Sequence, residues 1–388
     1  MTIKYWRSHM KAISSPFAVI LVGFFLVLSS QPLSAAALEP FTAKPGAPVT
    51  RAEWDKLVAD AKKEGKLVIY AGPIGEARSA LSNAFREKFG ITVDIVMSKS
   101  ADMVPKIEAE RRAGIYAVDV GFMGMESFFG SASLIGFTQP VSPLLVLPEI
   151  LDLSKWREKT LPCADKACHL TVLVLGSSPY TLINTGIVKP GEINSHQDLL
   201  DPKWRGKLII NDPSVGGAGS EWFTFILRKV MGIEKGTIFM KQLAQQAPAV
   251  TRDQRLLSEW VARGKYAVAL APDKATTAQL IRTGAPVAYI DLKEPRPTTS
   301  GPGNLMVFNK SPHPSATKLF VNWILSKEGA TVYSKAHGYP ATRIDVPTDG
   351  IDPFVIPKPS ETMLGEDYQS GRGEIRKLAA EVFRDIIK

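Results

Sequence analysis

The sequence is poor in cysteine and lacks the short motifs of several enzyme classes. Its 388 residues contain two cysteines, no His-Glu-x-x-His pattern, no Gly-x-Ser-x-Gly elbow and no glycine-rich loop that ends in Gly-Lys-Ser/Thr. These absences argue against a zinc protease, an α/β-hydrolase and a nucleotide-hydrolysing P-loop protein. A carboxylate pair assembled only in space leaves no such motif, so a secreted hydrolase stays the weaker alternative to a binding protein. We expect no catalytic residue and no cofactor.

The two cysteines lie close together in the segment Leu-Pro-Cys-Ala-Asp-Lys-Ala-Cys-His. In an oxidising compartment, a pair such as Cys163 and Cys168 closes a small disulfide loop. His169 follows the second cysteine, but two thiolates and one imidazole fall short of the four ligands of a structural zinc site. The sequence therefore predicts a disulfide and no metal site.

Long apolar runs are absent except near the N-terminus, where one extends from Phe17 to Leu28. It is preceded by Lys4, Arg7 and Lys11 and followed by the small residues Ser34, Ala35, Ala36 and Ala37. This order is typical of a cleavable signal peptide over residues 1–36, with a mature chain that starts near Ala37 or Leu38. The run is short for a membrane span of roughly 20 residues, and no cysteine follows it to accept a lipid. We expect a free periplasmic protein, with an uncleaved anchor as the alternative.

Tracts of basic residues are also missing. The formal charge of +9 falls to +6 when the three basic residues of the signal are removed, and the other Lys and Arg residues are scattered. Such a field attracts small anions or a negatively charged surface, and it does not indicate nucleic-acid binding.

Strand and helix patterns alternate along the first part of the mature chain. Thr50 and Glu53 form a capping box for a helix that ends at Gly65, and the apolar strand Lys66–Ala71 follows. The next expected elements are a helix that ends at Gly90, a strand over 91–97, a helix over 101–113 and a strand over 118–123. This alternation predicts an α/β fold with a mostly parallel sheet and helices on its faces.

A second α/β series follows a long β-rich stretch over 170–187, which we expect to cross between two lobes. Its expected strands are 208–211, 266–271 and 287–291, and its expected helices are 220–230, 236–247, 252–263 and 274–283. A strand over 305–308 and helices over 314–325, 328–336 and 373–387 are expected after residue 302. Residues 294–302 read as a return linker. About 350 mature residues suit two lobes: 45–123 with 290–335, and 124–289 with 336–388.

Several stretches together resemble the type II periplasmic solute-binding proteins of ATP-binding-cassette importers, in particular the branch with ferric-iron, phosphonate and sugar-phosphate binders. They are residues 54–70, 85–96, 118–120, Trp204-Arg205-Gly206-Lys207-Leu208 before Asp212-Pro213, and 313–329. The resemblance covers residues 50 to 345. It implies two lobes that close over a solute and a monomer that delivers this solute to membrane permease subunits. Presentation of the solute to a sensor kinase would use the same fold.

The resemblance also allows a test for iron. Iron-binding members place a histidine after the first strand, a carboxylate after the third and a Tyr pair in the second lobe. The corresponding positions here are Ile74, Gly124 and the stretch 272–274, and no Tyr-Tyr pair occurs in the chain. Ferric iron held directly by side chains is therefore not expected.

Most candidate ligand residues lie where strands end and helices begin, since ligands of open α/β sheets bind there. Ser178 and Tyr180 instead interrupt the apolar crossing stretch, where polar groups are costly unless they face the cleft or find partners. The predicted set is Gly72, Ser98, Ser100, Ser178, Tyr180, Ser214, Gly217, Ser220, Asp273 and Lys274. The glycine-rich loop 212–220 is the strongest candidate, because successive N–H groups could hold a carboxylate or phosphate. For several serines, a helix cap or a plain turn is the alternative.

The net charge and the Ser- and Gly-rich helix starts favour a small organic anion: a phosphonate, phosphate ester, sulfonate or carboxylate. A polyamine is an alternative ligand, for which Glu76, Asp102, Glu126 and Asp212 with Tyr70, Phe122 and Tyr180 could supply contacts. Ferric iron carried as a chelate is the other alternative.

Overall fold

The computed structural model describes residues 44–178, 180–246, 248–361, 364 and 371–387. They belong to one compact unit, Pro40–Lys388. The predicted signal peptide lies outside the described residues. None of the helices within these ranges has the length and apolar character needed to cross a membrane.

The first sheet has the strand order β2-β1-β3-β13-β4, and β5 also pairs with β13. Its strands are β1 (Lys66–Ala71), β2 (Thr92–Met97), β3 (Val120–Met123), β4 (Thr138–Gln139), β5 (Leu170–Val172) and β13 (Asn304–Phe308). β1 runs parallel to β2 and β3 as predicted, whereas β13 is antiparallel to β3, β4 and β5. The sheet is therefore mixed, because the returning chain enters it in the opposite direction.

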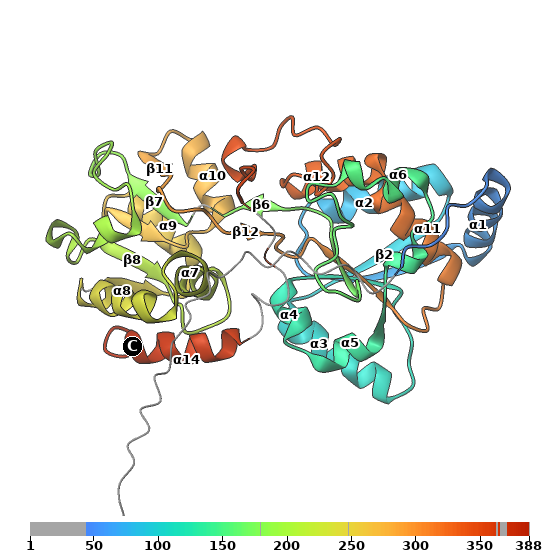
Figure 1. Cartoon of the computed structure of the whole chain (residues 1–388), viewed down its shortest axis with the longest axis horizontal. Helices are drawn as coiled ribbons and strands as arrows, with labels where there is room; N and C mark the ends of the chain where they lie inside the picture. The colour runs from blue at the N-terminus through green and yellow to red at the C-terminus, as the bar shows by residue number, and fades with distance from the viewer. Residues whose placement is uncertain (1–43, 179, 247, 362–363, 365–370, 388) are drawn as a thin grey trace, which may run out of the picture. The chain divides into compact units, whose positions relative to one another are not determined.

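Helices with buried apolar faces pack against this sheet. They are α1 (Arg51–Glu64), α2 (Ala77–Phe89), α3 (Ser100–Arg112), α4 (Met125–Phe129), α5 (Ala132–Phe137), α6 (Pro148–Leu151), α11 (Pro314–Leu325) and α12 (Lys327–His337). The predicted capping box of Thr50 and Glu53 is present. Figure 1 shows α2, α11 and α12 side by side. The ring of Phe85 on α2 packs against those of Phe320 and Trp323 on α11. This aromatic cluster is the centre of the first core.

The second sheet has the order β11-β7-β10-β8-β9. Its strands are β7 (Thr181–Asn184), β8 (Leu208–Asn211), β9 (Ala249–Thr251), β10 (Val268–Leu270) and β11 (Val287–Tyr289). The surrounding helices are α7 (Ala218–Phe225), which continues as a π-helix over Ile226–Val230, α8 (Ile233–Gln245), α9 (Gln254–Ala262), α10 (Lys274–Arg282) and α14 (Arg372–Val382). β8 pairs in parallel with β9 and β10, and β7 is antiparallel to β10 and β11.

Two short strands lie where the chain passes between the sheets. β6 (Gly176–Ser177) pairs antiparallel with β12 (Thr298–Thr299), so the predicted crossing stretch and return linker run side by side. The lobe boundaries stay a prediction. The pairing of β4 and β5 with β13 favours a first lobe that also contains residues 138–172, because strands of one sheet cannot separate without breaking their hydrogen bonds.

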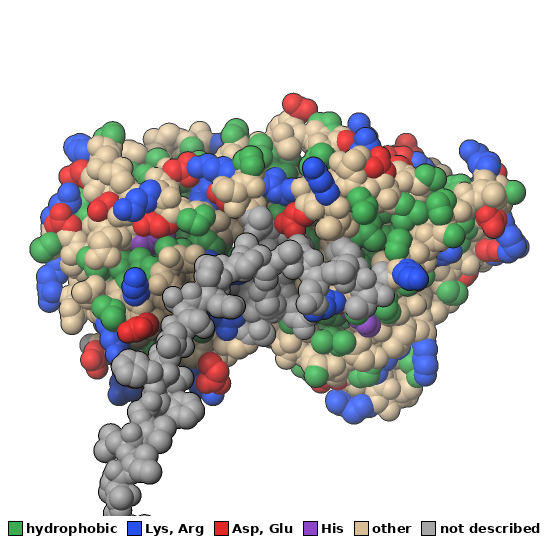
Figure 2. Space-filling view, in the orientation of Figure 1, with side chains coloured by type: hydrophobic (Ala, Val, Ile, Leu, Met, Phe, Trp, Pro, Cys, Tyr) green, Lys and Arg blue, Asp and Glu red, His purple; other side chains and the backbone are tan. Residues whose placement is uncertain are grey.

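The predicted disulfide is confirmed between Cys163 and Cys168. Its loop is held against the first sheet, because Cys163 forms an antiparallel β-bridge with Thr171 of β5 and the Val141 N–H donates to the Cys168 carbonyl. Figure 2 shows Lys and Arg side chains dispersed among acidic ones on the visible face, in agreement with the scattered charge of the sequence.

Candidate functional site

A cavity of about 190 Å³ lies where the crossing strands meet residues from both sheets. It is lined by Gly124, Met125, Glu126, Ser127, Leu175, Tyr180, Glu221, Pro297, Thr298, Thr299, Ser300, Gly301 and Leu364. A cavity volume of about 10–15 Å³ is enough for one water molecule. A cavity of about 190 Å³ is many times larger, so it has room for one compact solute. It is the candidate solute site.

The wall formed by residues 297–301 is fixed by a buried side chain. The Asn304 amide nitrogen donates to the Met123 carbonyl at 2.8 Å and to the Gly301 carbonyl at 3.2 Å, which ties the turn to the end of β3. Gly301 has φ of +52°, a left-handed conformation that favours glycine. Its N–H donates to the Thr299 hydroxyl oxygen at 3.2 Å, so the O–H of Thr299 can still donate to a solute.

Tyr180 and Glu221 form the side of the cavity that belongs to the second sheet. The Tyr180 hydroxyl donates to Glu221 Oε2 at 3.0 Å, and Tyr180 is almost fully buried. Glu221 lies in the first turn of α7, directly after the glycine-rich loop. A predicted ligand residue therefore does line the cavity.

Glu126 forms the opposite side, in the first turn of α4 after β3. Its carboxylate forms two ion pairs: Oε2 lies 3.2 Å from Arg372 Nη1, and Oε1 pairs with Arg376 Nη1. Both arginines belong to α14. The acidic charge of Glu126 is thus compensated at the edge of the cavity.

The glycine-rich loop uses its own polar groups internally. Asp212 Oδ1 accepts from the Ser214 N–H at 2.9 Å and from the Ser214 hydroxyl at 2.6 Å, and Asp212 Oδ2 pairs with Arg252 at 3.0 Å. Burial acts to raise the pKa of Asp212, but these hydrogen bonds and the guanidinium outweigh it and hold the pKa below its ordinary value. Ser214 is therefore engaged in an Asx turn.

The rest of this loop is closely packed. Gly217 precedes α7 with φ of +140°, and the Gly219 N–H donates to Asn211 Oδ1 at 2.9 Å. The Ser220 hydroxyl donates to the Gly217 carbonyl and accepts from Arg372 Nη2, each at 3.0 Å. Since Ser220 is fully buried, a contact with solute would require these partners to move.

The predicted residues of the first two loops lie nearer the first sheet. The Gly72 N–H donates to the Phe122 carbonyl at 2.8 Å, and a side chain at Gly72 would meet Pro302, the residue after the cavity wall. The Ser98 N–H donates to the Ala71 carbonyl, and its hydroxyl donates to the Lys99 carbonyl. Ser100 begins α3, and its side chain lies outside the description.

The remaining predicted residues lie on the side of the second sheet. Ser178 is buried and lines, together with Tyr180, a separate cavity of about 20 Å³ that has room for one water. Asp273 caps α10 by accepting from the Thr276 N–H at 2.6 Å. Lys274 Nζ donates to the Tyr339 hydroxyl at 2.6 Å.

His337 lies behind the cavity wall, next to Tyr339. The centre of its ring lies 5.2 Å from that of Tyr339, with the two planes tilted by 35°, and the ring also approaches Gly301. Neither ring nitrogen has a hydrogen-bond partner among the described residues. Burial lowers the pKa of His337 to about 4, with a further contribution from the positive charge of Lys274. His337 is therefore neutral at pH 7.

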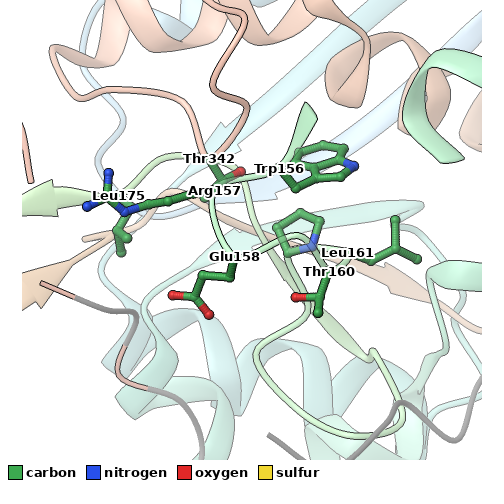
Figure 3. Close-up of a pocket in the computed structure, with 8 residues that line it drawn as sticks. Trp156, Arg157, Glu158, Thr160, Leu161, Leu175 and Thr342 are labelled. Atoms are coloured by element: carbon green, nitrogen blue, oxygen red, sulfur yellow. The ribbon is translucent and has the colours of Figure 1, made fainter. Parts of the chain in front are cut away.

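Another pocket lies beside the disulfide loop and is too small for an organic solute. Figure 3 shows Trp156, Leu161 and Thr342 around it, and its volume is about 20 Å³. Within the described residues, no group of three or more His, Cys, Asp or Glu side chains could hold a metal ion. The cavity between α4 and α7 is accordingly the better candidate.

Sequence reasoning missed several cavity residues. Thr298, Thr299 and Ser300 were expected only as part of a return linker, and Glu221 was not singled out. The available signal was the linker itself, since a segment that crosses between lobes must pass the cleft between them.

Comparisons with known proteins identify the family. Residues 80–356 match the model of the bacterial extracellular solute-binding proteins. An uncharacterized protein of Haemophilus influenzae is 26% identical over 272 residues, which is 69% of this chain and 75% of that protein.

Solved structures share the fold. The iron-bound HitA of Pseudomonas aeruginosa superposes with a TM-score of 0.62 at 19% identity, over 82% of this chain and 99% of HitA. AfuA of Actinobacillus pleuropneumoniae, a periplasmic binding protein with fructose-6-phosphate bound, gives 0.60 at 21% identity, over 83% of this chain and 98% of AfuA. Since the family model covers most of the chain, this protein belongs to the bacterial extracellular solute-binding proteins, a family of binders and not of enzymes.

Proposed function

We propose that this protein captures a small organic anion in the cavity between α4 and α7 and delivers it to the membrane permease subunits of an ABC importer. Family membership supports capture of a solute outside the cytoplasm. The position of the cavity beside the paired crossing strands supports binding by closure, because movement about β6 and β12 would open and close it.

The partners of the two carboxylates that line the cavity support an anion. Glu126 pairs with Arg372 and Arg376, and Glu221 accepts from the Tyr180 hydroxyl and lies 4.0 Å from Arg372 Nη1, so arginines compensate both negative charges. The hydroxyls of Ser127 and Thr299 lie on the same lining and can donate to a carboxylate or phosphate. This engagement of the two carboxylates is the observation that carries the substrate class.

The surroundings add positive charge. Arg372 and Arg376 lie at the edge of the cavity, and the mature chain has a formal charge of +6 once the predicted signal is removed. Such a field increases the encounter rate of small anions. The fructose-6-phosphate bound by AfuA shows that a protein of this fold can hold a phosphate ester.

A cation is the second candidate, and Glu126 and Glu221 favour it because both line the cavity. A polyamine would have to replace Arg372 and Arg376 at Glu126 or Tyr180 at Glu221. HitA binds iron, but the described residues of this chain offer no cluster of protein ligands for it.

A thermal-shift screen with Glu221→Gln tests the substrate class. We expect sugar phosphates, phosphonates, sulfonates or carboxylates to stabilise the mature protein, and Glu221→Gln to bind the hit as well or better, because a negative charge is removed. Stabilisation by polyamines alone, abolished in Glu221→Gln, would favour the cation. Ferric citrate belongs in the same screen, and stabilisation by it alone would contradict the organic-anion assignment.

A further inference from the structure

The helix α14 lies after the part of the chain that matches the family model, which ends at residue 356. It packs on the second sheet's helices: Ile375, Ala379 and Phe383 are buried in the same core as residues of α7 and α8. The rings of Phe223 and Phe383 meet edge to face at 6.2 Å. By these contacts, α14 moves with the second sheet.

Two arginines of α14 reach across to the other side of the cavity. Arg372 and Arg376 both pair with Glu126 on α4. α4 packs with the first sheet's core, in which Met125 and Phe128 are buried beside residues of β5 and β13. The carboxylate of Glu126 thus joins an element of the first sheet to an element of the second.

The two arginines differ in burial. The Arg372 side chain is 2% exposed and also donates to the Ser220 hydroxyl at 3.0 Å, whereas the Arg376 side chain is 32% exposed. Arg372 Nη1 lies 3.2 Å from Glu126 Oε2 but 4.0 Å from Glu221 Oε1 on α7, so the pair with Glu126 is the closer of its two ion pairs. Loss of the closer carboxylate from a buried guanidinium is costly. The paired carboxylate of Glu126 is bound by charge-assisted hydrogen bonds, the stronger kind.

We propose that Glu126, Arg372 and Arg376 form an electrostatic clasp that holds the two sheets together over the cavity in the absence of solute. When the cleft opens, α4 moves away from α14 and the Arg372–Glu126 pair is broken. Solute exchange therefore requires the clasp to open, and the population of the closed form depends on it.

Distances measured in the solute-free protein test the clasp. Spin labels are attached to Glu87→Cys on α2 and Lys241→Cys on α8, two exposed positions, after solute has been removed by unfolding and refolding with the disulfide intact. Pulsed electron–electron double resonance then gives the distribution of distances between the two labels. Three further substitutions are compared in this background: Glu126→Gln, Arg376→Gln and Glu374→Gln.

We expect a predominant short distance in the background protein. In Glu126→Gln the ratio of open to closed forms should rise about tenfold, since neutralising this side chain weakens both ion pairs. Arg376→Gln should give a smaller rise in the same direction. It removes only a partly exposed charge, so it tests the clasp even if Glu126→Gln does not fold. Glu374→Gln, a control on the exposed face of α14, should leave the distribution unchanged.

A single long distance in the background protein would overturn the proposal. So would distributions that do not change in Glu126→Gln and Arg376→Gln, or an equal change in Glu374→Gln. Because no solute is present, these outcomes are independent of whether the proposed substrate class is correct.

Discussion

The buried His337 should make the protein less stable at pH 5 than at pH 7, because only the unfolded chain can protonate this side chain in that interval. The imidazole is buried next to Tyr333 and Tyr339, with no partner for either nitrogen among the described residues. Its pKa falls from 6.5 to about 4 on folding, chiefly through burial. Between these two values the unfolded chain binds the proton and the folded one does not, so stability falls as the pH falls.

The magnitude follows from the same two pKa values. With 6.5 in the unfolded and about 4 in the folded state, the linkage relation gives a loss of roughly 2 kcal/mol in unfolding free energy from pH 7 to pH 5. Below about pH 4 both states bind the proton, and this contribution stops changing.

Urea unfolding at pH 7 and pH 5, followed by tryptophan fluorescence, measures the effect. His337→Phe keeps an aromatic ring but cannot bind a proton, so its loss of stability over this interval should be smaller than that of the unaltered protein by roughly 2 kcal/mol. Lys335→Gln, an exposed change on the same helix, is the control and should keep the full loss. Equal losses in the unaltered protein and in His337→Phe would show that His337 does not cause the loss of stability.

Two further predictions concern the loops. Gly219→Ala should destabilise the protein by about 1–3 kcal/mol and weaken solute binding, because the new Cβ would lie 2.2 Å from the Asn211 carbonyl oxygen. Gly216→Ala is the control and should be tolerated, since the nearest atom to its Cβ is 3.9 Å away. Equal melting temperatures for the two variants would contradict this prediction. Replacing both Cys163 and Cys168 by serine should lower the unfolding free energy by about 2 kcal/mol, since the disulfide closes only a short loop. An unchanged unfolding free energy in chemical denaturation would show that the disulfide does not stabilise the protein.

Local signals in the sequence predicted most of the fold. The capping box at Thr50, the left-handed Gly65 and Gly90 at the ends of α1 and α2, and the apolar run of β1 each depend on residues a few positions apart. Such patterns fix the bounds of helices and strands without reference to the rest of the chain. The pairing of β4 and β5 with β13 depends on residues more than 130 positions apart, and no local pattern predicts it.

The candidate site was harder to predict for the same reason. Ser214 and Ser220 were expected to hold an anion because they lie in a glycine-rich loop before a helix. In the fold, the Ser214 hydroxyl donates to Asp212. The Ser220 hydroxyl accepts from Arg372, which lies 152 positions further along the chain. Tyr180 does line the cavity, and its signal in the sequence is local: a polar group within an apolar crossing stretch must face the cleft or find another polar partner.

The cavity between α4 and α7 is the proposed solute site. The most direct measurement is the thermal stability of the mature protein, of Ser127→Trp and of Ser79→Trp against a panel of sugar phosphates, phosphonates, sulfonates and carboxylates. Ser127 is a half-buried residue of the cavity lining, so a tryptophan there should fill the cavity, whereas Ser79 is exposed on α2. A ligand at 100 times its dissociation constant stabilises by about 2.7 kcal/mol. We expect stabilisation of the unaltered protein and of Ser79→Trp but not of Ser127→Trp. Equal stabilisation of all three proteins would show that the solute binds elsewhere.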